Sequence, residues 1–374
     1  MYSFRSEEAR AEEARELLIR LVEIPSVTYD EDAACRYLME ALSMSKPTST
    51  SSFPDTREGA PLVWEDIHRD EVGNVVARRG SGDREIVLMG HIDTVSGGPC
   101  FRVEGDVLWG RGSVDAKGPL CAFAMAGGAA QVLEGWRITL IAAVGEEGDS
   151  RGARHVLPFH SPAACVIGEP SGTSGVTLGY RGYLRFQVHA QDSGAHRSGN
   201  PGPITACLMA AADILGEVER RNDTLKPVIE RPSGAVIAMR GTEEGERTGF
   251  VDLDVRLPVG ADPTLWGRDF IELGERRGVT VEMLSSMSAH LVDKNNPIVR
   301  ALRLAVREAG LTPRFLVKGG TADFNLAAAW SCPMAAYGPG DSKLDHTAEE
   351  HTDLNDYLRS ISILKNALEK FMEP

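Results

Sequence analysis

Four short runs of mostly apolar residues are the clearest pattern in this 374-residue chain. Near-continuous apolar runs of this length are typical of strands in a parallel sheet that is covered on both faces. Helical patterns precede and separate the runs, so the chain predicts an α/β fold with a mixed, mostly parallel sheet. The runs cover residues 85–90, 137–145, 163–168 and 334–337.

Three helices are predicted in the first part of the chain. Apolar residues at helical spacing between positions 14 and 21 predict a helix that ends before Pro25. Thr28 and Glu31 have the spacing of a capping box, which predicts a second helix to about position 44. An apolar stretch predicts a third helix at 119–133. Residues 45–61 are rich in Ser, Thr, Pro and Gly and predict a mobile surface loop.

The pattern changes after residue 176. Apolar and polar residues alternate at 183–190 and 250–258, as in half-exposed strands. With the intervening helical and apolar segments, the order becomes β-α-β-β-α-β, which is typical of a ferredoxin-like domain. We therefore expect a discontinuous catalytic domain, residues 1–176 and 291–374, and an inserted lid and dimerisation domain, residues 177–290.

Polar residues follow the predicted strands at their carboxyl ends. His91, Glu146 and Glu169 come directly after three different apolar runs, and Asp115 and His346 lie in glycine-containing loops. In open α/β sheets, ligands bind at the carboxyl edge, so separate strands would bring these side chains to one region. A lone histidine or an acidic pair is more often solvated surface, but five such placements together favour a site.

Two histidines and three carboxylates can hold two zinc-like ions if one carboxylate bridges them. His91, Asp115, Glu147, Glu169 and His346 are the predicted ligands. Imidazole and carboxylate ligands also accept cobalt or manganese. Two further residues complete the predicted chemistry. Glu146 is the base that takes a proton from water, and Asp93 is the acceptor that orients the His91 ring.

The motifs MGHIDTV, WGRGSVDAKG, VGEEGDSRGA, IGEPSG and LDHTAEEH resemble the metallopeptidase family that includes carboxypeptidase G2, aminoacylase-1 and acetylornithine deacetylase. The resemblance extends through essentially the whole chain. It implies that His91 and Glu169 hold one zinc ion, that Glu147 and His346 hold the other, and that Asp115 bridges them. It also implies that Glu146 is the general base and that such lids dimerise through an exposed strand and helix.

Residues of the predicted lid and of two later loops are candidates for substrate binding. The resemblance implies that His196 stabilises an oxyanion and that Arg256 holds a substrate carboxylate. Gly320, Thr321 and Asp323 in the motif KGGTADFN, and Asp341 in GPGDSKLDHT, are further candidates. A cationic amine needs a nearby carboxylate, so we expect Asp323 or Asp341 to bind it. The structural alternatives are that Asp323 caps a short helix and that Asp341 closes a turn.

These last two motifs most resemble the branch of the family that releases lysine or ornithine from an amino-group carrier protein. A small N-acyl amino acid, such as acetylornithine or succinyl-diaminopimelate, is the alternative substrate. A metal-binding interaction protein without turnover is a third interpretation, against which the intact Glu146 argues. Carrier proteins of this kind are acidic, so docking requires a local basic patch, for which the following residues are candidates: Arg181, Arg185, Arg197 and Lys318.

Composition limits the other partners. The formal net charge of −14 argues against nucleic acid. No apolar stretch reaches the roughly 18 to 20 residues of a membrane span, and the acidic N-terminus has no signal-peptide pattern, so we expect a cytoplasmic protein. The six cysteines show no C-x-x-C spacing and are predicted to be buried free thiols.

Overall fold

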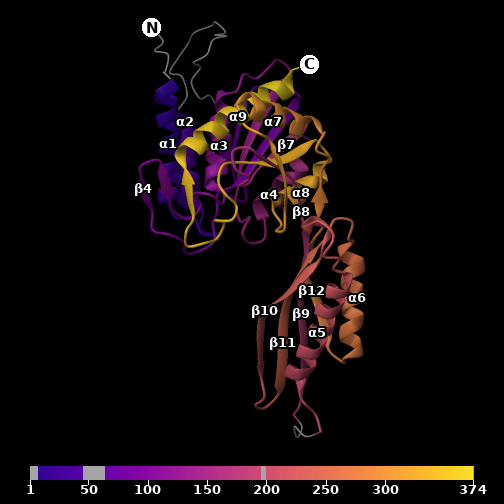
Figure 1. Ribbon diagram of the computed structural model, residues 1–374. Coiled ribbons are helices and arrows are strands. Elements are labelled where there is room, and N and C mark those ends of the chain that lie inside the picture. The colour runs from indigo at the N-terminus through magenta and orange to yellow at the C-terminus, as the bar shows by residue number, and fades with distance from the viewer. Residues whose placement is uncertain (1–6, 45–63, 195–198, 374) are drawn as a thin grey trace, which may run out of the picture. The chain divides into compact units, whose positions relative to one another are not determined.

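The computed structural model describes residues 7–44, 64–194 and 199–373, which form two compact units (Figure 1). The first unit contains Met1–Leu178, Val292–Leu316 and Leu326–Pro374, and the second contains Gly179–Leu291 and Val317–Asn325. Val317–Asn325 therefore groups with the inserted unit, whereas the sequence analysis placed it in the discontinuous domain. The predicted loop at 45–61 and His196 lie outside the described residues.

A nine-stranded mixed sheet is built mostly from residues of the first unit, and only β13 and the ends of β8 and β14 come from residues of the second. Its strand order is β1-β2-β6-β3-β7-β15-β8-β13, and β14 also pairs with β8. The central pairs β6–β3, β3–β7 and β7–β15 are parallel, so their carboxyl ends meet at one edge. The strands are β1 (Asp66–Arg69), β2 (Val75–Arg79), β3 (Arg84–His91), β6 (Trp136–Ala143), β7 (Ala164–Gly168), β8 (Gly175–Tyr180), β13 (His290–Leu291), β14 (Arg314–Lys318) and β15 (Met334–Tyr337).

Helix α3 (Lys117–Ala129) packs on β3 and contacts both α1 and α9, and α9 also packs against α7. The predicted end of this helix at residue 133 is wrong. Gly127 and Gly128 weaken its last turn. The helix ends at Ala129, because Ala130 has an extended backbone. The other helices of the first unit are α1 (Glu7–Glu23), α2 (Asp32–Met44), α4 (Arg151–Val156), α7 (Pro297–Glu308) and α9 (Leu354–Met372), while α8 (Asp323–Ala327) begins in the second unit.

The capping box predicted at the start of α2 is wrong. Its Glu31 would have to accept the Thr28 backbone N–H, but that group donates to the Thr94 carbonyl at 3.1 Å, and Glu31 accepts the Tyr29 N–H at 2.9 Å. The Thr28 hydroxyl donates to the Asp93 carboxylate at 2.9 Å instead of capping the helix. A tertiary contact has thus taken the side chain that the local pattern assigned to the helix.

The second unit has the predicted ferredoxin-like topology. Its four-stranded antiparallel sheet has the order β10-β11-β9-β12, and the chain order is β9-α5-β10-β11-α6-β12. Phe186 and Phe270 pack edge to face in the core between the sheet and its helices. The elements are β9 (Gly182–Asp192), α5 (Pro203–Arg221), β10 (Ser233–Thr242), β11 (Arg247–Leu257), α6 (Pro263–Arg276) and β12 (Thr280–Met287).

Smaller features complete the fold. A three-stranded sheet joins β16 (His351–Asp353), β5 (Val107–Trp109) and β4 (Arg102–Glu104).

None of the helices in the described part of the chain is long and apolar enough to cross a membrane. All six cysteines are free thiols, and four are buried, but Cys100 is exposed and Cys332 is half-buried, so the prediction of burial is wrong for these two.

Candidate metal centre

The parallel strands of the first unit deliver its polar residues to one edge of the sheet. His91 is the last residue of β3, and Glu169 directly follows β7. Glu146 and Glu147 come three and four residues after the end of β6, beyond Gly145, whose φ of +76° turns the chain. The three strands are largely buried, and the polar side chains stand at or just beyond their carboxyl ends.

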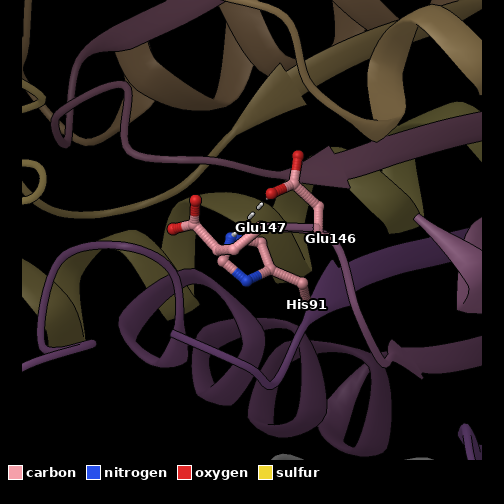
Figure 2. Close-up of side chains that lie close together, drawn as sticks. All are labelled: His91, Glu146 and Glu147. Carbon is pink, nitrogen blue, oxygen red and sulfur yellow. Dashed lines mark ion pairs between the residues drawn. The ribbon is translucent and has the colours of Figure 1, made fainter. Parts of the chain in front are cut away.

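His91 is oriented by its own loop. Its Nδ1 lies 2.9 Å from the main-chain oxygen of Asp93 and 3.6 Å from the Asp93 carboxylate. With the proton on Nδ1, the other nitrogen, Nε2, presents a lone pair. That nitrogen faces Asp115 Oδ1 at 3.2 Å and Glu146 Oε2 at 4.0 Å, as Figure 2 shows for Glu146.

His346 approaches the same aspartate from another loop. Its Nε2 lies 3.1 Å from Asp115 Oδ2 and 2.7 Å from Glu147 Oε1. The two oxygens of Asp115 therefore face one imidazole each. This is the arrangement that a carboxylate needs in order to bridge two ions, each with its own histidine.

Asp93 has more hydrogen-bond partners than the sequence predicted. Its carboxylate accepts the backbone N–H groups of Glu146 at 3.0 Å and Glu147 at 3.1 Å, in addition to the Thr28 hydroxyl. Asp93 is fully buried, so these bonds are not exchanged with water. It fixes the loop that carries the two glutamates as well as the loop that carries His91.

The electrostatics of the centre favour a cation. Burial opposes charge on His91, but Asp115, Asp93 and Glu146 raise its pKa well above the usual value. Hydrogen bonds to Asp115 and Glu147 raise the pKa of His346 to about 10. Despite burial, the two histidines hold the pKa of Asp115 below its usual range. The carboxylates around the two imidazoles thus favour a positive charge at this place.

The donor atoms fit divalent metal ions. Among the described residues, two groups have ligand atoms within 4.8 Å of one another: His91 with Glu146 and Glu147, and Asp115 with Glu147 and His346. Glu169 is in neither group, although it is buried at the end of β7 and its N–H donates to the Tyr337 carbonyl. Glu146 lies as near to His91 as a ligand would, so geometry alone does not separate the base from the ligands.

Two charged residues near the centre were not predicted from the sequence. Glu350 is fully buried and accepts three backbone N–H groups of the loop that ends at Asp115. Lys117 is buried and donates to the Leu21 and Ile24 carbonyls, and burial lowers its pKa to about 8. Both stand inside the motifs of the resemblance, Lys117 two residues after Asp115 and Glu350 four residues after His346, but this position does not separate Glu350 from its neighbour Glu349.

The predicted substrate-binding residues are divided between the two units. In the second unit, Arg256 pairs with Asp254 at 2.9 Å and donates to the Thr321 hydroxyl at 3.3 Å. Gly320 has open space where a side chain would stand, and Asp323 is buried at the start of α8. In the first unit, exposed Asp341 accepts the Lys343 N–H, which is the bond expected of a turn-closing residue.

The basic-patch candidates differ in how firmly they are held. Arg181 donates to the carbonyls of Gly319 and Arg231 and to the Ser233 hydroxyl. Burial and the neighbouring Arg256 and Arg231 lower the pKa of Arg181. Arg185 lies 3.4 Å from Asp254, which thus faces two arginines. Arg197 lies outside the described residues.

Comparison with known proteins assigns the family. Residues 87–370 match the model of peptidase family M20/M25/M40. The chain is 35% identical over 372 residues to a LysW-lysine hydrolase of Deinococcus radiodurans, covering 97% of this chain and 98% of that protein. It is 30% identical over 301 residues to a LysW-lysine/LysW-ornithine hydrolase of Sulfurisphaera tokodaii, covering 78% and 82%.

Solved structures agree on the fold. The M20 family metallo-carboxypeptidase Sso-CP2 of Sulfolobus solfataricus has a TM-score of 0.73 at 17% identity, over 96% of this chain and 99% of that one. Aminopeptidase PepT of Bacillus cereus has a TM-score of 0.72 at 14% identity, over 97% and 99%. The fold and the cluster of metal donors thus define a metal-dependent amide hydrolase. The chain belongs to peptidase family M20/M25/M40.

Proposed function

We propose that this protein hydrolyses the amide bond between the terminal glutamate of an amino-group carrier protein and the α-amino group of lysine or ornithine, releasing the free amino acid. The observation that supports this reaction centre is that each carboxylate oxygen of Asp115 faces a different imidazole. The proposed substrate is supported by the relatives, which are named for LysW-linked lysine and ornithine and match 97% and 78% of this chain.

Two divalent ions complete the centre in this proposal. His91 and Glu169 would hold one ion, Glu147 and His346 the other, and Asp115 would bridge them. The imidazole and carboxylate donors suit zinc and also accept cobalt or manganese. When bound, the ions supply an acidified water and polarise the scissile carbonyl.

The remaining chemistry belongs to the chain itself. The Glu146 carboxylate is only 11% exposed and lies beside His91, where it can take the proton of the attacking water and pass it to the departing amine. Asp93 keeps Glu146 and Glu147 in place through their backbone N–H groups. His196 is proposed to stabilise the oxyanion, as the family resemblance implies.

The second unit would recognise the carrier and form a homodimer. Arg256 is proposed to hold the carboxylate of the released amino acid. All of β10 is exposed and forms an open edge, with apolar side chains at Val236, Ile237 and Met239. Leu208 and Met209 are exposed on α5, which packs against β10. An apolar sheet edge of this kind is a template for pairing with a second copy.

Product analysis tests the substrate. Purified protein loaded with zinc is mixed with carrier-linked lysine, carrier-linked ornithine, acetylornithine and succinyl-diaminopimelate, and released amino acids are measured by mass spectrometry. We expect release from the carrier-linked substrates with the higher kcat/KM. Faster cleavage of the small acyl compounds would overturn the carrier assignment and leave the amide hydrolase.

Two substrates that differ in the charge of the side chain test the amine site. Asp323→Asn and Asp341→Asn are each assayed with carrier-linked lysine and with carrier-linked norleucine, which lacks the cationic tail. The residue that binds the amine should raise KM for lysine alone when replaced. Equal losses for both substrates in both variants would exclude Asp323 and Asp341 from amine recognition.

A further inference from the structure

Glu350 holds the loop that ends at Asp115 through a single carboxylate oxygen. Its Oε1 accepts the backbone N–H groups of Gly112 at 2.9 Å, Val114 at 3.0 Å and Asp115 at 3.1 Å. The Gly110 N–H also bonds to the Glu350 main-chain oxygen at 3.4 Å. Because Glu350 is fully buried, these bonds lack competition from water and fix the backbone of Asp115.

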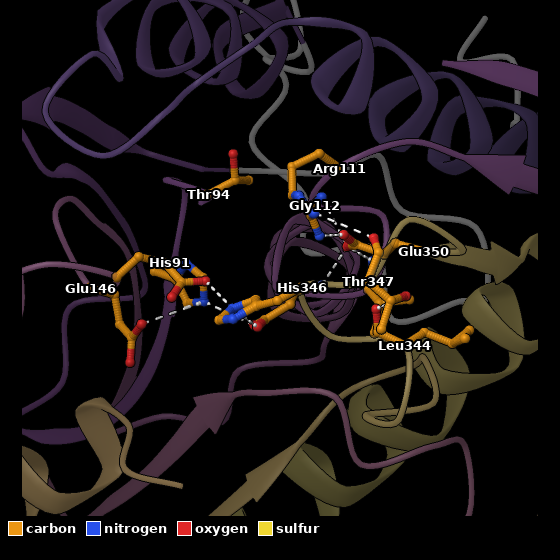
Figure 3. A network of polar contacts seen from close by, with 12 residues as sticks. His91, Thr94, Arg111, Gly112, Glu146, Leu344, His346, Thr347 and Glu350 are labelled. Carbon is orange, nitrogen blue, oxygen red and sulfur yellow. Dashed lines mark hydrogen bonds and ion pairs between the residues drawn. The ribbon is translucent and has the colours of Figure 1, made fainter. Parts of the chain in front are cut away.

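Arg111 joins this loop to the one that carries His346. Its guanidinium pairs with the second oxygen of Glu350 and donates to the Thr347 carbonyl at 3.3 Å. Its Nε donates to the Gly97 carbonyl at 3.2 Å. Figure 3 shows Arg111, Glu350 and Thr347 on one side of His346, with His91 and Glu146 on the other.

Both loops need such a support. Asp115 and His346 lie outside the strands, so the sheet does not set their positions. His346 has a left-handed backbone, with φ of +61°, and its side chain is 48% exposed. Gly340, earlier in the His346 loop, has a φ of +97°, and a Cβ there would lie 2.9 Å from Val114. The two loops therefore pack closely, and a small shift of one moves a ligand relative to the other.

We propose that Glu350 and Arg111 are positioning residues that set the distance between Asp115 and His346. They thereby raise the affinity for the second metal ion, the one that His346 would hold. The inference rests on the proposed two-ion centre and assigns it a support that touches neither ion nor substrate. Outer partners of metal ligands are typically worth about 10- to 100-fold in metal affinity.

Glu350→Gln is the direct test because it keeps the size of the side chain. If the amide oxygen faces the three backbone N–H groups, the amide NH₂ meets the Arg111 guanidinium, and two donors oppose each other. If the amide turns over, the loop loses its acceptor. We expect this variant to bind the first zinc ion normally and the second about 10- to 100-fold more weakly, in titrations of the metal-free protein against a chromophoric chelator.

Arg111→Lys is the second variant. It keeps the positive charge beside Glu350 but cannot reach the Gly97 and Thr347 carbonyls together. A smaller loss in second-ion affinity, between the wild type and Glu350→Gln, is expected. This variant also keeps the inference testable if Glu350→Gln does not fold.

Glu85→Gln is the matched control. Glu85 is also a buried carboxylate with several partners, but it lies at the amino end of β3, away from the metal centre. It should lower the unfolding temperature without changing either zinc affinity. Wild-type affinity for the second ion in both Glu350→Gln and Arg111→Lys, or an equal loss in Glu85→Gln, would overturn the positioning role. A wild type that binds fewer than two ions would instead contradict the proposed centre itself.

Discussion

The two ends of strand β3 both carry buried charges, but their partners differ. At the amino end, the Glu85 carboxylate accepts the Thr139 hydroxyl at 2.6 Å and lies 3.1 Å from His160 Nδ1 and 3.3 Å from Arg137 Nε. Burial opposes its charge, but these partners lower the pKa of Glu85 to about 2. One negative charge thus meets three donor groups, and the cluster is complete as it stands.

At the carboxyl end, carboxylates outnumber imidazoles among the residues that the structure describes. Two imidazoles face a group of carboxylates, and the ion pairs of Asp115 and Glu147 are with those histidines. Lone pairs that converge in a buried place need a cation between them. Buried charge alone therefore does not indicate a binding site, whereas a buried cluster in which carboxylates outnumber the basic groups does. The carboxylates are Asp93, Asp115, Glu146, Glu147 and Glu169.

The largest effect that separates the two ends should be on turnover. Glu146→Gln removes the proposed proton acceptor, and general base catalysis is worth roughly 10²- to 10⁴-fold in rate. We therefore expect kcat to fall by that factor while about two ions remain bound, measured by plasma mass spectrometry. The control, Glu134→Gln, makes the same change at an exposed position. Loss of an ion in Glu146→Gln would show that Glu146 is a ligand and would assign the base to another group.

Metal removal should have the next largest effect. Ions that bind only the folded chain stabilise it by about 2.7 kcal/mol when the free ion is at about 100 times its dissociation constant. Dialysis against a chelator should therefore lower the unfolding temperature, and zinc should restore it. Glu85→Gln protein should gain the same increment, because the amino end of β3 takes no part in binding. An increment that differs between the two proteins would mean that the ends are coupled.

The strands and their polar ends could be predicted because a covered parallel strand leaves an unbroken apolar run in the sequence. His91 and Glu169 stand where such a run ends, so their place at the carboxyl edge follows from the pattern. The order of elements in the second unit follows from alternation in the same way.

The supports of the centre could not be predicted, because they depend on contacts between distant segments. Thr28 reaches Asp93, and Glu350 reaches the loop at Gly112, across 65 and 238 positions in the sequence. A local pattern assigned Thr28 to a helix cap, and no pattern distinguished Glu350 from its exposed neighbour Glu349. Burial decides both cases, and burial is a property of the folded chain.

The third prediction concerns stability at the balanced end. Glu85→Gln leaves the buried Thr139 hydroxyl, His160 and the half-buried Arg137 without their charged acceptor, and an unsatisfied buried partner costs about 1 to 3 kcal/mol. Urea unfolding should show a loss of that size. Asp66→Asn is the control, because Asp66 is an exposed carboxylate paired with Arg78 and His68, and such pairs are worth roughly 0 to 1 kcal/mol. Equal losses in the two variants would mean that burial of the Glu85 cluster adds nothing.

The smallest effect is the acid dependence of that same difference. The folded-state pKa of Glu85 is about 2, below the 4.5 of an unperturbed glutamate. The unfolded chain therefore takes up a proton first as the pH falls, so the stability contributed by Glu85 is complete above about pH 4.5 and disappears as the pH approaches 2.

Metal-free wild type and Glu85→Gln should be compared by urea unfolding between pH 6 and pH 2.5, as rough limits that span this window. Protonation of the metal-centre carboxylates affects both proteins alike, so it cancels in their difference. The difference in unfolding free energy should be constant down to about pH 4.5 and then shrink, because glutamine does not titrate. A difference that stays constant through the whole range would mean that Glu85 titrates equally in the folded and unfolded chains, and that the amino end of β3 is not a balanced ionic cluster.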